Sequence, residues 1–364
     1  MAEGAPARGD PGVLRPQEFF WRDQQVWLES KGYMLRPRYR PGWVPSWHGT
    51  KRSAFDCEDG FLQPRINLLD ATRIADGKIV MIKRIFINES PDEVEITRMF
   101  ATEPLSSDPR NHCVPVIEVL TVPDSDDIRL LVMPLLRAFN NPPFNTLGEV
   151  VECLRQLFEG LQFIHEQHIA HRDCMDFNIM MDPLGMFPKL YHPQNPRRTL
   201  DWKLKKVKHY SRTYKPRKYY FIDFGLSRRY DPTDGPPLDL PVLGGDKTVP
   251  EFKDQDLPHD PFPTDIYYLG NMMRECFLQK FAGVELLASL VDDMVQDDPT
   301  KRPTIAEVVT RFEEMRKPLT SWQLRARLAP LNETGFERFT RSSAHWVRTI
   351  AFVLTRRSAL PTPS

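Results

Sequence analysis

The spacing of apolar positions changes between residues 136 and 146. Before this point, from Ile79 to Leu136, apolar residues occur in short β-branched runs, IVMIKRIFI, VPVIEVLTV and IRLLVMPLL, which predict strands. One helix is predicted among them at SPDEVEITRMF, where a Ser-Pro start precedes acidic residues. From Thr146 onward the apolar residues recur at helical spacing over long segments, as in LGEVVECLRQLFEGLQFIHEQ. We therefore expect an α+β protein with two lobes: a small β-rich N-lobe with one main helix, reaching to about residue 136, and a larger α-helical C-lobe.

The two ends of the chain differ from this main region. Residues 1–20 are rich in Ala, Gly, Pro and Arg without apolar periodicity, which predicts a disordered lead. Residues 21–59 contain the aromatic and basic stretch LRPRYRPGWVPSW and are interpreted as an extension packed on the N-lobe. The main domain is expected over residues 60–316, and residues 317–364 form a basic C-terminal tail.

Composition narrows the class of protein. The 364 residues include 49 Lys or Arg and 49 Asp or Glu, and this neutrality argues against a general nucleic-acid binder. The five cysteines show no close pairing, which favours a reducing compartment. Neither a signal-peptide core nor an apolar run of membrane-spanning length is visible, so we expect an intracellular protein, cytoplasmic or nuclear, without a transmembrane segment.

The charges are unevenly distributed along the neutral chain. Residues 189–218 carry eleven Lys or Arg against one acidic residue, with aromatics interleaved. This basic insert is either a solvated, twisted hairpin or a docking surface for an acidic protein, nucleic acid or lipid headgroups. Residues 316–364 carry nine basic and two acidic residues, and HWVRTIAFVLTRR predicts a short amphipathic helix. That helix either packs back on its own domain or lies at a membrane interface.

Several short motifs follow one another in a recognisable order. VMIK ends at Lys83, HRDCMDFN spans His171 to Asn178, and DFG begins at Asp223 directly after an apolar strand. With this order the sequence resembles the eukaryotic protein kinases over about residues 60–316. The combination of LRPRYRPGWVPSW, LLDATRIADGKIVMIKR, NIMMD and GGDKTVPEF is also similar to the protein-kinase-domain proteins abundant in mushroom-forming fungi, and this similarity spans almost the whole chain.

The resemblance implies a nucleotide site on the predicted strands and the first helix. Lys83 corresponds to the lysine that holds the α and β phosphates of ATP, and Glu95 to its salt-bridge partner on the helix. Met99, one turn later, is expected to face the interior beside Phe224. The resemblance also assigns nucleotide contacts to Met133 and Leu135.

The resemblance further implies the groups that transfer phosphate. Asn178 and Asp223 correspond to the ligands of two Mg²⁺ ions, and oxygen ligands of this kind suit that metal. Asp173 corresponds to the residue that accepts the substrate hydroxyl proton. The expected activity is Mg-ATP-dependent transfer of the γ-phosphate to a protein hydroxyl, with Ser or Thr favoured by base rate.

Other residues match structural markers of the same family. Glu251 in VPEF resembles the glutamate that closes the activation segment, and Arg302 its buried ion-pair partner. Asp265 resembles the aspartate that braces the backbone of the catalytic loop. In the activation segment, phosphate acceptors are expected among four residues, and Arg172 is a candidate to bind the added charge; the four are Ser227, Tyr230, Thr233 and Thr248.

Three features depart from the family pattern. The sequence before Lys83 lacks a GxGxxG hairpin, Met81 replaces the usual small residue beside adenine, and Met175 replaces a lysine. In addition, Asn178 and Asp223 are 45 positions apart, which requires an insertion of about thirty residues. The alternative to an active enzyme is therefore a pseudokinase with a degenerate nucleotide site that binds partners through its basic insert and tail.

Overall fold

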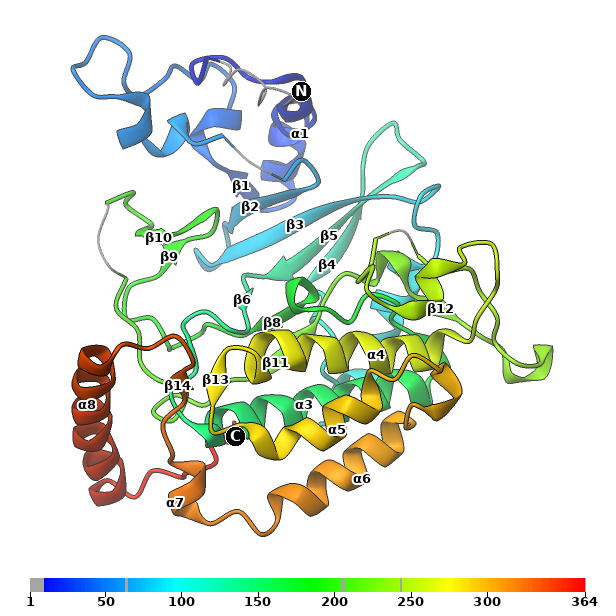
Figure 1. Ribbon diagram of the computed structural model, residues 1–364. Helices are drawn as coiled ribbons and strands as arrows, with labels where there is room; N and C mark the ends of the chain where they lie inside the picture. Colours follow the sequence, from blue (N-terminus) through cyan, green and yellow to red (C-terminus); the bar gives the residue numbers. More distant parts are fainter. Residues whose placement is uncertain (1–9, 63–64, 204–206, 243, 364) are drawn as a thin grey trace, which may run out of the picture. The chain divides into compact units, whose positions relative to one another are not determined.

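The computed structural model describes residues 10–62, 65–203, 207–242 and 244–363 (Figure 1). The chain divides into two compact units. Unit 1 comprises Met1–Ile85, Val116–Leu135 and Phe187–Lys208, and unit 2 comprises Phe86–Pro115, Leu136–Met186 and His209–Ser364. Helices occur together with sheets whose paired strands are antiparallel, so the fold is of the expected α+β class. In the described residues, no helix combines the length and apolarity needed to cross a membrane.

Unit 1 is built on a five-stranded sheet in the order β1-β2-β3-β5-β4. Its strands are β1 (Tyr33–Leu35), β2 (Leu68–Arg73), β3 (Ile79–Phe86), β4 (Glu118–Thr121) and β5 (Ile128–Pro134). The pairs β1/β2, β2/β3 and β4/β5 are antiparallel, and Leu68 lies opposite Lys83. The N-terminal segment thus contributes an edge strand to the sheet.

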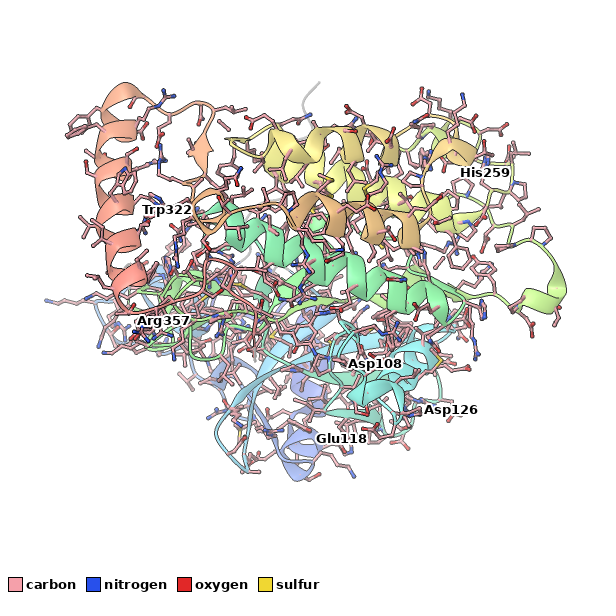
Figure 2. The ribbon with its side chains drawn as sticks, turned by 90° about the horizontal axis from the view of Figure 1, so that it is seen from below. Asp108, Glu118, Asp126, His259, Trp322 and Arg357 are labelled. Carbon is pink, nitrogen blue, oxygen red and sulfur yellow. The ribbon has the colours of Figure 1, made fainter. Side chains whose placement is uncertain are left out.

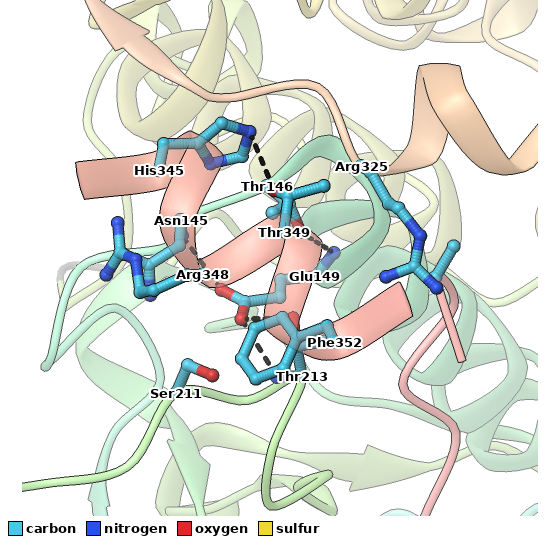
Figure 3. A pocket seen from close by; sticks show the side chains of 11 residues that line it. Asn145, Thr146, Glu149, Ser211, Thr213, Arg325, His345, Arg348, Thr349 and Phe352 are labelled. Carbon is cyan, nitrogen blue, oxygen red and sulfur yellow. Dashed lines mark hydrogen bonds between the residues drawn. The ribbon is translucent and has the colours of Figure 1, made fainter. Parts of the chain in front are cut away.

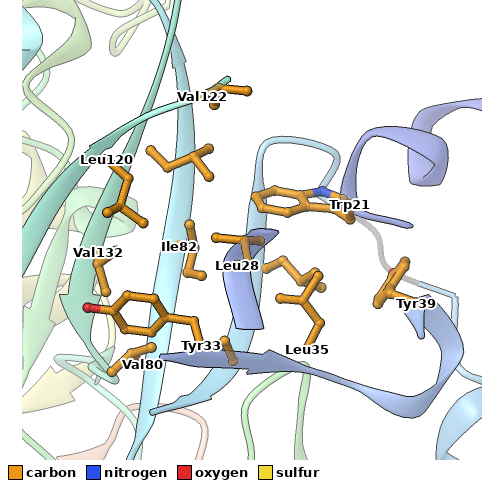
Figure 4. Close-up of a cluster of buried hydrophobic side chains, with 13 residues drawn as sticks. Trp21, Leu28, Tyr33, Leu35, Tyr39, Val80, Ile82, Leu120, Val122 and Val132 are labelled. Atoms are coloured by element: carbon orange, nitrogen blue, oxygen red, sulfur yellow. The ribbon is translucent and has the colours of Figure 1, made fainter. Parts of the chain in front are cut away.

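The core of unit 1 lies on one face of this sheet (Figure 4). Trp21 and Leu28 of α1 (Phe19–Ser30) pack with Val80 and Ile82 of β3, and all four side chains are at most 1% exposed. Since side chains alternate across a strand, Lys83 lies on the opposite face of β3. The first helix of the chain therefore covers the back of the strand that carries the predicted phosphate-binding lysine.

Part of the segment expected to be disordered is structured. The guanidinium of Arg38 is buried and donates to the carbonyls of Pro11 (2.6 Å) and Val13 (3.0 Å) as well as to both carboxylate oxygens of Glu18 (2.7 and 3.0 Å). A buried arginine needs several acceptors, and here residues 10–18 supply them. Residues 1–9 of the expected lead lie outside the described residues.

The first half of the basic insert forms a hairpin in unit 1. Strands β9 (Tyr191–His192) and β10 (Asn195–Thr199) are antiparallel, and residues 204–206 lie outside the description. His192 Nε2 lies 3.2 Å from a carboxylate oxygen of Glu58, and Gln194 donates to Asp70 at 2.8 Å. The hairpin interpretation is thus confirmed for this stretch, and the hairpin contacts the N-terminal segment and β2 of its own unit.

Unit 2 is mainly helical. Helices α3 (Leu147–Glu166), α4 (Pro261–Met273), α5 (Ala288–Met294) and α6 (Ile305–Arg316) lie side by side (Figure 1). Thr146 caps α3 by accepting a hydrogen bond from the backbone N–H of Glu149, which satisfies a donor of the first turn. The remaining helices are α2 (Glu93–Phe100), α7 (Ser321–Leu324) and α8 (Gly335–Leu354).

Short strands in unit 2 position the loops between these helices. A three-stranded sheet has the order β11-β8-β6, formed by β6 (Arg137–Ala138), β8 (Ile179–Met181) and β11 (Tyr219–Phe221). Two-stranded pairs join β7 (Ile169–Ala170) to β12 (Arg228–Arg229) and β13 (Phe281–Ala282) to β14 (Ala329–Pro330).

Candidate functional site

The HRDxxxxN loop of unit 2 is held by its own side chains. Asn178 Nδ2 donates to the carboxylate of Asp173 at 2.6 Å and to its backbone carbonyl at 3.1 Å. Asp173 Oδ1, by contrast, is a buried oxygen without a hydrogen-bond partner among the described residues. One oxygen of the carboxylate is therefore fixed while the other keeps its capacity to accept a proton.

Helix α4 supports this loop from beneath. Asp265, which is 0% exposed, accepts hydrogen bonds from the backbone N–H groups of His171 (2.8 Å) and Arg172 (2.7 Å). The ring of His165, on α3, lies 2.9 Å from the same carboxylate. Asp265 thus braces the backbone of the HRDxxxxN loop, as predicted.

Asp223 is brought beside Asn178 by strand pairing. Strands β8 and β11 are antiparallel with Ile179 opposite Phe221, and Ile222 donates to the carbonyl of Asn178 at 2.9 Å. At the other end of the pair, the N–H of Asp182 donates to the carbonyl of Lys218 at 2.9 Å. The two ends of the long segment between residues 182 and 218 therefore lie side by side, so this insertion does not separate Asn178 from Asp223.

The electrostatics of this site differ from those of an isolated carboxylate. Burial, opposed by the hydrogen bond from Asn178 and reinforced by the negative charges of Asp223 and Asp265, raises the pKa of Asp173 to about 6. Asn178 uses its amide nitrogen for Asp173, which leaves its amide oxygen for a cation. Together with the exposed carboxylate of Asp223, this donor set fits a hard cation such as Mg²⁺.

The phenylalanine of the DFG sequence anchors the next segment. Phe224 is 1% exposed, and its ring centroid lies 5.6 Å from that of Phe100 on α2 and 5.0 Å from that of His171. Phe100 of α2 therefore reaches Phe224, and Met99, which was expected beside Phe224, is half-buried one position earlier.

The glutamate on the inner side of α2 also differs from expectation. Glu95 is exposed, whereas Glu93 is 3% exposed, and its Oε2 lies 3.1 Å from the position that a Cβ on Gly225 would occupy. Glu93 and Phe100 are two helical turns apart and share one face, from which Glu95 points away. Glu93 and Glu95 are the two glutamates of the same EVE triplet, so the buried carboxylate lies two positions before the one expected from the sequence.

The predicted nucleotide residues of unit 1 lie on two neighbouring strands. Lys83 and Met81 are half-buried on the same face of β3, opposite the face that packs on α1. Met133 on β5, the strand next to β3, and Leu135 just after it are also half-buried. These four positions line the side of the sheet that α1 leaves uncovered.

The segment that would cover phosphates is organised differently from a Gly-rich hairpin. The connection from β1 to β2 covers residues 36–67 and, where described, passes through 3-10 turns at Pro37–Tyr39, Ala54–Asp56 and Glu58–Gly60. The tight turn lies one strand later, between β2 and β3, where Gly77 has a φ of 69°. That turn is closed by Asp76, which pairs with Arg73 at 2.6 Å.

The activation segment carries a carboxylate that the sequence did not single out. Asp239 lies 3.2 Å from Arg172, accepts a hydrogen bond from Arg228 at 2.6 Å and another from Tyr230 at 2.9 Å. Arg172 also donates to the carbonyl of Leu240 at 2.8 Å. The charge of Arg172 is therefore already neutralised by the protein, and no sequence spacing would have connected these residues.

All four expected phosphate acceptors make hydrogen bonds in this structure. Ser227 is 5% exposed and donates to the carbonyl of His171 at 2.9 Å, and Tyr230 binds Asp239. Thr233 and Thr248 are exposed; the hydroxyl of Thr233 donates to Asp231 at 2.7 Å, and that of Thr248 lies 3.2 Å from the hydroxyl of Tyr267.

The predicted ion pair at the end of the activation segment is confirmed. The guanidinium of Arg302 contacts both carboxylate oxygens of Glu251, at 2.6 and 2.7 Å, and the two side chains are 0% and 3% exposed. Such a bidentate pair fixes the segment to the start of α6 through paired charges that water does not reach.

Comparison with known proteins points to kinases. No family model matches the chain. A light-sensor protein kinase of Ceratodon purpureus is 26% identical over 250 residues, covering 61% of this chain and 18% of that protein. A probable cyclin-dependent kinase 9 of Schizosaccharomyces pombe is 26% identical (31% and 21% covered), and cyclin-dependent kinase B2-1 of Arabidopsis thaliana is 29% identical (32% and 41% covered). The matches support a protein-kinase-like family, and the matched region spans less than half of each relative.

Proposed function

We propose that this chain is a protein kinase that transfers the γ-phosphate of ATP to a protein hydroxyl, of Ser or Thr by base rate. The observation that carries the proposal is the loop of unit 2, where Asp173, Asn178 and Asp223 are held together by β8, β11 and Asp265. A purely structural loop has no need of a carboxylate with one fixed oxygen and one unpartnered oxygen beside two further oxygen ligands.

In this proposal Asp173 positions the substrate and receives its proton. The hydrogen bond from Asn178 holds one oxygen, so the other points its lone pairs at the attacking hydroxyl. With a pKa of about 6 the carboxyl is ionised at neutral pH but is a stronger base than an exposed aspartate. The increased basicity of Asp173 follows from its burial near the carboxylates of Asp223 and Asp265.

The remaining groups would hold Mg-ATP. Asn178 and Asp223 supply oxygen ligands for Mg²⁺, which neutralises charge on the phosphates when bound. Lys83 would contact the α and β phosphates, with Glu93 rather than Glu95 as the carboxylate that fixes it. Met133 and Leu135 would line the adenine side.

The alternative, a pseudokinase scaffold, rests on the missing Gly-rich hairpin and on Met81 and Met175. Its proposed docking element, the basic insert, is partly engaged already, because His192 and Gln194 contact Glu58 and Asp70. The kinase is therefore the function favoured here, with protein substrates as its partners and Mg-ATP as its cofactor.

The test compares wild type with Asp173→Asn in two assays. We expect millimolar Mg-ATP to raise the melting temperature of both proteins, because Asp173 is not a nucleotide ligand in the proposal. Only wild type should incorporate label from γ-labelled ATP into a protein substrate. ATP with EDTA is the control for the metal. Absence of a thermal shift in wild type would contradict nucleotide binding, and a shift without label would favour the pseudokinase.

A further inference from the structure

Helix α8 packs on unit 2 with its polar side. Its buried residues are His345 and Thr349, whose side chains lie 3.3 Å apart (Figure 3). Arg348 donates to Asn145 at 3.3 Å across the same contact, which lines a small cavity of ≈ 10 Å³. The helix thus packs back on its own unit through a mainly polar side that includes the half-buried Phe352, and most of the apolar side that an amphipathic helix normally buries lies outside this contact.

The apolar side of α8 faces outward. Phe336, Phe339, Trp346, Ile350 and Val353 are exposed by 77, 71, 58, 56 and 44%, and Val347 and Leu354 beside them by 70 and 77%. Side chains of these sizes expose on the order of 800 Å² together, more than the largest apolar patch of a typical monomer. The same area is about what one partner contributes to a stable protein interface.

These residues follow the spacing of a helix-pairing seam. Phe336, Phe339, Ser343, Trp346, Ile350 and Val353 are separated alternately by three and four positions. This is the repeat of the inner positions of a coiled coil, and it extends over nearly the whole length of α8. We refer to these six residues as the α8 stripe.

The charges of α8 distinguish between possible occupants of the stripe. Arg338, Arg341 and Arg348 each stand two residues after a stripe residue, and hence about 200° around the helix from it. A helix bound to an anionic membrane needs free cations on its polar side, whereas here Arg341 pairs with Glu333 and Glu337, and Arg348 contacts Asn145. The positions flanking the stripe hold residues such as Thr340 and Ser342, so no charge repels a second copy or selects a different helix.

We propose that the α8 stripe is a self-association surface that pairs with the stripe of a second copy of this chain about a two-fold axis. The contact is isologous, since the same residues bury one another on both copies. Arg357, which follows the C-terminal end of α8 (Figure 2), is held 4.6 Å from the ring of Tyr214, so the basic end of the helix stays on its own unit. This inference does not depend on kinase activity.

The first test measures the mass of the full chain by sedimentation velocity over a range of concentrations. We expect a dimer that Ile350→Arg weakens at least tenfold in Kd, because a cation would be buried in the seam. Ala351→Arg is the matched control: it places the same charge on the neighbouring exposed residue, outside the stripe. A monomer at all concentrations, or a dimer equally stable in both variants, would overturn the proposal.

The second test traps the dimer with a covalent disulfide, so it detects association even when the affinity of the two copies is low. Ser343 lies near the middle of the stripe, so Ser343→Cys should form a disulfide-linked dimer on mild oxidation whichever way the two helices run. Ala344→Cys should not. The five native cysteines are buried and should not compete. Monomeric protein that sediments with phosphatidylserine vesicles, and loses this binding in Ile350→Arg, would instead assign the stripe to a lipid surface.

Discussion

The carboxyl of Asp173 is hydrogen-bonded, buried and close to other negative charges, and all three factors set the pH at which it titrates. Because its pKa is raised to about 6, we expect kcat/KM to fall as pH drops through this value, when the base becomes protonated. A flat profile down to pH 5 would be inconsistent with Asp173 as the base.

The same carboxyl should influence stability with the opposite sign. A group whose pKa is higher in the folded than in the unfolded state costs stability once ionised, so the cost is complete above pH 6 and falls to zero below the ordinary pKa of 3.8. Asp173→Asn should therefore stabilise the fold by about 1–3 kcal/mol at pH 7.5 and by about half as much at pH 5. Urea unfolding at the two pH values measures this difference, and equal effects at both would exclude the raised pKa.

The two glutamates of α2 offer a matched comparison. Glu93 is buried against Gly225 and Glu95 is exposed. We expect Glu93→Gln to lower kcat/KM by one to two orders of magnitude, because it removes the charge proposed to fix Lys83, an effect of about 1.4 kcal/mol per tenfold. Glu95→Gln should change kcat/KM less than twofold. The reverse outcome would restore the assignment made from sequence.

Among the elements, the activation segment is ordered by its own carboxylate. Since Asp239 already pairs with Arg172 and Arg228, we expect activity without phosphorylation of this segment. Asp239→Asn should lower kcat at least tenfold in protein made in cells without kinases, whereas Asp234→Asn, an exposed change in the same segment, should not. If phosphatase treatment of wild type abolishes activity, a phosphate and not Asp239 supplies the charge.

The beginning of α3 is fixed by the C-terminal segment. A Cβ on Gly148 would lie 2.0 Å from the carbonyl oxygen of Ala359 and 3.0 Å from that of Leu324. Because both obstacles are backbone, Gly148→Ala should destabilise the fold by about 1–3 kcal/mol. Gly335→Ala, at the start of α8 with open space around it, should be neutral or slightly stabilising. Denaturant unfolding of the two variants tests this, and equal losses would argue against the contact.

The elements that could be predicted from sequence were those with a strong local period. The β-branched runs gave β3 and β5, and the apolar stripe from Thr146 gave α3. The sequence could not show which glutamate of the EVE triplet is buried, because Glu93 and Glu95 lie on opposite sides of α2 and only tertiary packing distinguishes them. Residues 10–18 and Asp239 were missed because long-range contacts with arginines order them, and such contacts leave no periodic signal in the chain.

On the scale of the whole molecule, formal neutrality results from a balance of segments. Residues 189–218 and 316–364 together carry twenty basic and three acidic side chains, so the rest of the chain is acidic by 17 charges. Part of this basic charge is used internally, as in Arg212, whose buried guanidinium donates to the carbonyls of Phe139 and Pro142. The basic segments are therefore partly structural, and their net charge overstates what is free to meet a partner.

The division of the chain has a consequence for how the molecule can be taken apart. Unit 1 consists of three separate stretches, so the backbone passes between the units five times. No single truncation or proteolytic cut can release either unit as a contiguous fragment. The first half of the chain would contain all five strands of the unit 1 sheet but not the hairpin of residues 191–199. Swapping one unit between relatives would require five coordinated junctions.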